Sequence, residues 1–125
     1  MGEWIQGIHH VNLKADSPEK FQETVKFYSE VLGMDIIRCS NGENGRYSAM
    51  IDTGAGRMEI GMADDVLPQG NIRHIALATN RVPEVAERVR AAGYQITREP
   101  FEASIATIAF CIGPCGEEIE LFDEK

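Results

Sequence analysis

The three histidines of the chain stand in two stretches that repeat each other. When "IHHVNLKA" is placed over "IRHIALAT", His10 falls on His74. Two glutamates repeat in the same way, since Glu59 in "GRMEIGM" falls on Glu120 in "EEIELFD". Imidazole and carboxylate groups are ligands that divalent transition metals accept. The two matched pairs therefore predict a metal site built by an internal repeat.

Strand periodicity places the first of these histidines on a polar face. Alternate residues of a strand share one face, so His10 lies with Asn12 and Lys14. Val11 and Leu13 lie on the other face, and we expect both to pack under a helix. The other three candidates also alternate with apolar pairs. All four candidates are therefore expected to face a cavity rather than the core.

Two carboxylates in one cavity are costly without a counter-charge. A divalent ion removes that cost, because two neutral imidazoles and two carboxylates balance it and leave positions open for water or substrate. The predicted ligands are His10, Glu59, His74 and Glu120. For any one of them alone, the alternative is a surface position on a half-exposed strand, but four matched positions favour the metal. His9 falls on the opposite face from His10 and is interpreted as structural.

The composition is that of an ordinary globular chain with an acidic surface. The 125 residues are 43% hydrophobic and 26% charged, and the formal net charge is −8. This excess of acid disfavours nucleic acid and anionic membranes as partners. No apolar run approaches the roughly 20 residues of a membrane span. The start, "MGEWIQG", lacks the basic region and apolar core of a signal peptide, so we expect a cytoplasmic protein.

The cysteine pattern agrees with a reducing compartment. Cys39, Cys111 and Cys115 are an odd number without a pair of CxxC motifs, and we interpret them as reduced thiols. Cys111 and Cys115 are close enough in sequence to bind a metal together. Packing in the core and in a turn is the favoured interpretation of these two.

A helix is expected after each of the two histidine strands. The first, "DSPEKFQETVKFYSEVLG", begins at a cap formed by Asp16 or Ser17 and ends at Gly33. The second, "NRVPEVAERVRAAG", has Pro83 near its start and ends at Gly93. Apolar residues recur at helical spacing in both. These predicted faces are Phe21, Val25, Tyr28 and Leu32 in the first helix, and Val82, Val85, Ala86 and Val89 in the second.

Three further strands complete each half. We expect them in "MDIIRC", "YSAMID" and "GRMEIGM", and again in "YQITRE", "TIAFCIG" and "EEIELFD". Arg38 then matches Arg98, and Ile51 matches Ile112. Each half reads strand, helix, strand, strand, strand. The expected organisation is one domain, 1–125, with modules at about 5–63 and 71–124 and a linker at 64–70 that contains Pro and Gly.

The order of the motifs "HV.L…FY..VLGM", "MEI", "HIAL" and "IELF" resembles the vicinal-oxygen-chelate superfamily, which includes glyoxalases and bleomycin-resistance proteins. The resemblance covers residues 5–124. It implies an α+β fold in which two tandem βαβββ modules with curved mixed sheets enclose a metal cavity, often completed by a homodimer. The metal positions of the superfamily fall on His10, Glu59, His74 and Glu120 of this sequence.

Within the superfamily, the four filled positions and the stretch "FYSEVLGMDIIR" look most like glyoxalase I, the lactoylglutathione lyases. This resemblance implies a metal-dependent lyase or isomerase that acts through an enediolate on a small substrate with vicinal oxygens. The glutathione hemithioacetal of methylglyoxal is the first candidate substrate. Glu120 is expected to act as the base, with Glu59 as its symmetry mate. One divalent ion per site is expected, and nickel, zinc, cobalt, manganese and iron all accept this ligand set.

Several positions depart from the glyoxalase I pattern. Lys14 stands where an arginine is usual, Ala63 replaces a polar residue, and "EPFEASIAT" lacks a glycine-rich, lysine-bearing segment that helps to hold glutathione. Arg98 matches a basic position associated with the glutathione carboxylates, and the expected substrate-binding residues are Lys14, Asn12 and Arg98. The alternatives are another metalloenzyme of the superfamily, such as methylmalonyl-CoA epimerase or a thiol transferase, and a non-enzymatic ligand-sequestering protein of bleomycin-resistance type.

Overall fold

The computed structural model describes residues 9–63 and 74–125. The chain divides into two compact units, Met1–Val66 and Leu67–Lys125. The expected linker, 64–70, lies outside the described residues, as do the first residues of both expected modules. Among the described residues, no helix is long and apolar enough to cross a membrane.

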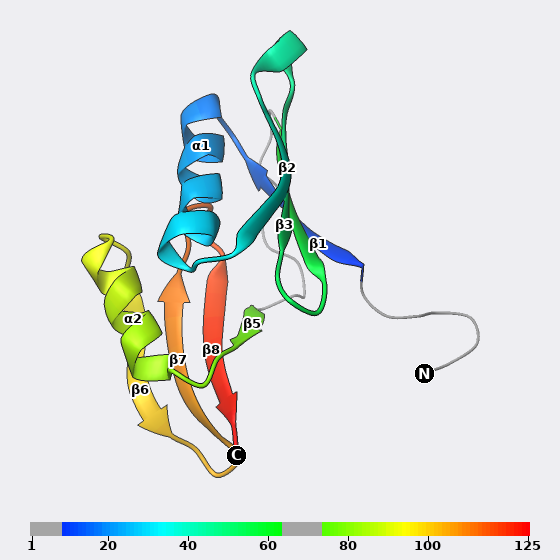
Figure 1. The fold of residues 1–125 in the computed structure, drawn as a ribbon. Helices are drawn as coiled ribbons and strands as arrows, with labels where there is room; N and C mark the ends of the chain where they lie inside the picture. Colours follow the sequence, from blue (N-terminus) through cyan, green and yellow to red (C-terminus); the bar gives the residue numbers. More distant parts are fainter. Residues whose placement is uncertain (1–8, 64–73) are drawn as a thin grey trace, which may run out of the picture. The chain divides into compact units, whose positions relative to one another are not determined.

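The first unit is a four-stranded mixed sheet with a helix packed on it (Figure 1). Its elements are β1 (His10–Ala15), α1 (Pro18–Lys26), the π-helical turn η1 (Phe27–Val31), β2 (Asp35–Asn41), the 3-10 turn η2 (Glu43–Gly45), β3 (Tyr47–Asp52) and β4 (Arg57–Met62). The strand order is β1-β4-β3-β2, with β1 parallel to β4 and the other neighbours antiparallel. Helix α1 packs against β1, β3 and β4.

The second unit repeats this topology. Its elements are β5 (Ile75–Ala78), α2 (Val82–Ala91), β6 (Ile96–Glu102), β7 (Ala106–Ile112) and β8 (Glu118–Glu124). The strand order is β5-β8-β7-β6, again with the first strand parallel to the last and the other neighbours antiparallel. The predicted α+β class and the βαβββ order of both halves are thereby confirmed. Each sheet is open, with two edge strands.

The first helix begins at a predicted cap and stops before the predicted glycine, but its last turn is not α-helical. Ser17, rather than Asp16, is the cap, since its hydroxyl accepts a hydrogen bond from the Lys20 backbone N–H at 3.1 Å. The helix then widens into the π-helical turn η1 before Gly33. Phe27, the first residue of this turn, is buried, at 1% exposed, although the regular spacing left it off the apolar face.

Two expectations about packing and register were wrong. Val11 is 38% exposed rather than packed under α1, because β1 is an edge strand and Val11 lies near its start. Ile51 corresponds to Cys111 and not to Ile112. Both are fully buried, and Ile51 pairs with Met58 as Cys111 pairs with Ile119. The offset in residue number between matched positions of the two halves is therefore one smaller for β3 and β7 than for β4 and β8.

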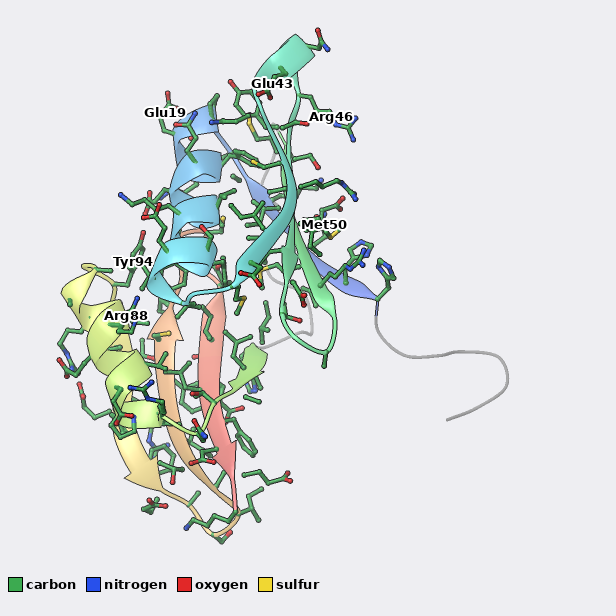
Figure 2. The ribbon with its side chains drawn as sticks, viewed as in Figure 1. Glu19, Glu43, Arg46, Met50, Arg88 and Tyr94 are labelled. Atoms are coloured by element: carbon green, nitrogen blue, oxygen red, sulfur yellow. The ribbon has the colours of Figure 1, made fainter. Side chains whose placement is uncertain are left out.

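The match between Arg38 and Arg98 is confirmed by the register. Arg38 pairs with Met50 of β3, which is labelled in Figure 2 and pairs in turn with Glu59 of β4. Arg98 pairs with Phe110 of β7, which pairs with Glu120 of β8. Each arginine thus lies two strands away from one of the two glutamates, in the same row across its sheet.

A buried carboxylate fixes the turn that leads into β8. The side chain of Glu117 fills the space beside Gly113, where an added Cβ would lie 2.5 Å from its Cδ. Glu117 is 8% exposed and accepts a hydrogen bond from the Cys115 backbone N–H at 2.8 Å. Burial, together with the charge of Glu117, raises the pKa of the Cys111 thiol to about 11. This turn sets the position of the first residues of β8.

Gly113→Ala is expected to lower the free energy of unfolding by about 1–3 kcal/mol, because the new methyl group would displace the Glu117 carboxylate. Urea titration measures the loss. In a Glu117→Ala background the same glycine substitution should cost much less, since the obstructing carboxylate is gone. Equal losses in the two backgrounds would show that the two side chains do not compete for this space.

Candidate functional site

In the first unit, the parallel pairing of β1 with β4 brings a histidine and a glutamate together. Asn12 pairs in register with Glu59, and His10 lies two residues earlier on the same face of β1. The Nε2 atom of His10 is 3.9 Å from Oε1 of Glu59, and both side chains are about one third exposed, at 38% and 29%. Asn12 donates a hydrogen bond from Nδ2 to the same Oε1 at 2.5 Å. The amide of Asn12 therefore orients the Glu59 carboxylate.

Lys14 continues this polar face toward the end of β1. It pairs with Gly61, and its ammonium nitrogen occupies the space above that glycine. An added Cβ at residue 61 would lie 2.9 Å from Nζ of Lys14. Because Gly61 has no side chain, the ammonium group of Lys14 fits above it. Lys14 lies two residues from Asn12 on the same face of β1.

In the second unit, the equivalent pairing of β5 with β8 positions His74 and Glu120. Ala76 pairs with Glu120, and His74 stands one residue before β5. The Nε2 atom of His74 is 3.2 Å from Oε1 of Glu120, whose side chain is 12% exposed. The other ring nitrogen, Nδ1, is 3.7 Å from Oε1 of Glu118. The histidine and the glutamate are closer together here than in the first unit, and the glutamate carboxylate is more buried.

A cleft of about 440 Å³ opens beside His74 in the second unit. Its lining residues are His74, Thr97, Arg98, Phe110 and Glu118. The rings of His74 and Phe110 meet edge to face, with centroids 5.7 Å apart. The Arg98 guanidinium lies over the Phe101 ring, 3.8 Å from its centroid, and this stacking steadies the arginine. The cleft offers a cation, a carboxylate, a hydroxyl and an aromatic wall to a small molecule.

Two residues beside the predicted ligands were not expected to contribute. Glu118 touches His74, and strand period could have identified it, because it lies two residues before Glu120. His9, interpreted from the sequence as structural, is exposed, and its Nδ1 is 3.0 Å from Nδ1 of His10. Strand period gave no signal for His9, since adjacent residues of a strand point to opposite faces.

The four predicted ligands lie as one histidine–glutamate pair in each unit. In the part of the chain that the structure describes, no three His, Cys, Asp or Glu side chains gather that could hold a metal ion. A four-ligand site therefore needs one pair from each of two units. Cys39, Cys111 and Cys115 form no disulfide with one another, and Cys111 is buried.

Comparisons with known proteins agree with the topology and the residue pairs. The family model of the Glyoxalase/Bleomycin resistance protein/Dioxygenase superfamily matches residues 7–121. The chain belongs to this superfamily. It is 32% identical over 122 residues to a lactoylglutathione lyase of Escherichia coli O157:H7, a match that covers 83% of this chain and 84% of that protein. The resemblance found in the sequence is thus confirmed.

Solved structures show the superfamily fold in proteins of different kinds. A V278E mutant of glyoxalase I from Zea mays matches with a TM-score of 0.74 and 25% identity, covering 92% of this chain and 43% of that one. TnmS3, an antibiotic binding protein from Streptomyces sp. CB03234, also has a TM-score of 0.74, at 19% identity, covering 99% and 100% of the two chains. Fold alone therefore does not separate catalysis from binding in this superfamily.

Proposed function

We propose that this protein is a metal-dependent lyase or isomerase of glyoxalase I type, acting on a small substrate with two vicinal oxygens. The observation that carries the proposal is the histidine–glutamate pair on the polar face of each unit, in a chain similar to lactoylglutathione lyases. The glutathione hemithioacetal of methylglyoxal is the first candidate substrate. The product would be the thioester of a 2-hydroxy acid, formed without net oxidation.

The residues present fit a divalent metal ion. In each unit, Nε2 of the histidine faces a carboxylate oxygen of the glutamate, so two electron-pair donors converge. Two neutral imidazoles with two carboxylates carry a charge that a divalent ion balances, and nickel, zinc, cobalt, manganese and iron accept such donors. The proposed ligands are His10, Glu59, His74 and Glu120. The pairs would come from two units of one 1–125 domain or from two chains of a homodimer, with the sheets enclosing the site.

A bound metal ion would act as a Lewis acid toward the two substrate oxygens. The chain itself supplies the proton transfer. Glu120 is the better placed base, because its carboxylate is less exposed than that of Glu59 and its partner His74 lines the cleft. It takes the proton from one substrate carbon and returns it to the neighbouring carbon. Glu59, held by the Asn12 amide, is the symmetry mate and the second candidate for this role.

Three further side chains are proposed to bind the substrate. Arg98 lines the cleft with its guanidinium steadied on Phe101, and a planar guanidinium can hold a carboxylate through two parallel hydrogen bonds. Lys14 offers a second cation on the polar face of the first unit, without that geometry. Asn12 completes this group through its contact with Glu59.

A second candidate is another metalloenzyme of the superfamily, such as an epimerase or a thiol transferase. The observation that favours it is Glu118, which lines the same cleft as Arg98. A carboxylate there weakens the attraction of the cleft for an anionic substrate, a glutathione conjugate and an acyl-CoA alike, and so favours a thiol transferase that acts on a less charged substrate. Assays with the hemithioacetal, an acyl-CoA epimerase substrate and an electrophilic epoxide with free thiol distinguish these reactions.

Metal content is expected to depend on both residue pairs. The purified protein should bind one divalent ion per set of His10, Glu59, His74 and Glu120, and the quadruple alanine variant should bind none. Elemental analysis after dialysis against each metal in turn measures this. Lys14→Ala, which alters the same face without removing a ligand, is the control. A quadruple variant that still carries one ion per site would refute the ligand assignment.

Glu120→Gln is expected to lose turnover far more than metal. Glutamine keeps an oxygen ligand but cannot accept a proton at neutral pH, so kcat should fall by roughly 10²- to 10⁴-fold. Lys14→Ala should instead raise KM with little change in kcat, because it removes a contact with substrate. Steady-state kinetics together with metal analysis check both. Full turnover in a metal-loaded Glu120→Gln variant would transfer the role of base to Glu59.

A homodimer is expected, because homodimers often complete the metal cavity in the superfamily to which the chain belongs, and because the edge strand β2 exposes Ile36 and Ile37, at 45% and 44%. Sedimentation at micromolar concentration should give twice the mass of one chain, and a single-chain mass would contradict this. Mixing two dead variants, His10→Ala/Glu59→Ala and His74→Ala/Glu120→Ala, then locates the site. Mixed dimers regain metal only if each site takes its pairs from different chains.

A further inference from the structure

The two ring nitrogens of His74 face two different carboxylates. Nε2 is 3.2 Å from Oε1 of Glu120, and Nδ1 is 3.7 Å from Oε1 of Glu118. A neutral imidazole carries one proton, so only one nitrogen can donate while the other offers a lone pair. If Nε2 is the atom that binds metal, the proton must be on Nδ1, where Glu118 is the acceptor.

The first unit shows the same division between the two nitrogens of its histidine. Nε2 of His10 faces Glu59 at 3.9 Å, and Nδ1 of His10 lies 3.0 Å from Nδ1 of His9. In both units the ring presents Nε2 to the glutamate and Nδ1 to a second side chain, which is an imidazole in the first unit and a carboxylate in the second. The same division of the two ring nitrogens thus recurs in both units.

We propose that Glu118 is a positioning residue, which holds His74 with its proton on Nδ1 and its Nε2 lone pair directed at the metal. This inference rests on the proposed metal site. A partner of this kind fixes the ring orientation and makes the ligating nitrogen a better electron donor. The distance of 3.7 Å is longer than a hydrogen bond, so the proposed contact requires His74 and Glu118 to approach each other when the metal binds.

The local structure supports this role rather than direct ligation by Glu118. Glu118 lies two residues before Glu120 on β8, so both carboxylates share the face toward His74. They approach different nitrogens of that ring, which places Glu118 on the side away from Nε2. The preceding turn, held by Glu117 against Gly113, fixes where β8 begins. Glu118 is therefore placed to contact the ligand and not the ion.

The test uses the full chain and zinc, which gives no paramagnetic broadening. Glu118→Ala should weaken zinc binding by about 10- to 100-fold in competition with a chromophoric chelator. Glu118→Gln, which keeps an acceptor oxygen and the side-chain shape, should restore part of that loss. Glu124→Ala is the matched control, because it removes one exposed carboxylate from the same face of the same strand and should bind zinc like the wild type.

A second measurement reports on the proton directly. In the zinc-loaded protein, the Nδ1–H of His74 should give a slowly exchanging signal in ¹H–¹⁵N spectra, and Glu118→Ala should lose it. If the wild type binds zinc and Glu118→Ala matches Glu124→Ala in affinity and spectrum, the positioning role is wrong and the metal site stands. If the wild type binds none of zinc, nickel, cobalt, manganese and iron, the proposed function and this inference fall together.

Discussion

Parallel pairing between the first and last strands of each unit is the constraint on which the candidate site depends. It brings Asn12 beside Glu59 and Ala76 beside Glu120, although each pair is more than 40 residues apart in the chain. Parallel strands cannot be joined by a tight turn, so a long crossover must separate them. Here that crossover is the helix and the two intervening strands. In each unit, the histidine and the glutamate lie close together because the first and last strands of that unit pair.

The two units share one frame but surround the histidine–glutamate pair with different residues. In the first, the pair is more open, and Asn12 and Lys14 surround Glu59 with an amide and a cation. In the second, Glu120 is nearly buried and its histidine borders a cleft that also contains Arg98. The internal repeat thus keeps a histidine–glutamate pair in both halves while the residues around the pair differ.

Packing behind the polar faces keeps the site in register. In the first unit, Phe27 and Tyr28 of the turn η1 are both buried. In the second unit, Glu117 is buried against Gly113 in the turn that leads into β8. Burial, together with the charge of Glu117, raises the pKa of the Cys111 thiol to about 11, so this core residue stays neutral at ordinary pH. The Glu117 contacts hold the turn from which Glu118 and Glu120 follow.

The sequence by itself determined the order of elements, the starts and stops of the helices and the polar face of the strands, because capping and periodicity are local. It also matched Arg38 with Arg98 and the two histidine–glutamate pairs. Tertiary structure alone decided how Ile51 aligns with Cys111, since register depends on pairing between strands. It likewise decided that Lys14 fills the space over Gly61 and that His9 and Glu118 face Nδ1 of the ligand histidines. Strand period places Glu118 on the face of Glu120, but which ring nitrogen each side chain approaches depends on the geometry across strands, which no one-dimensional pattern carries.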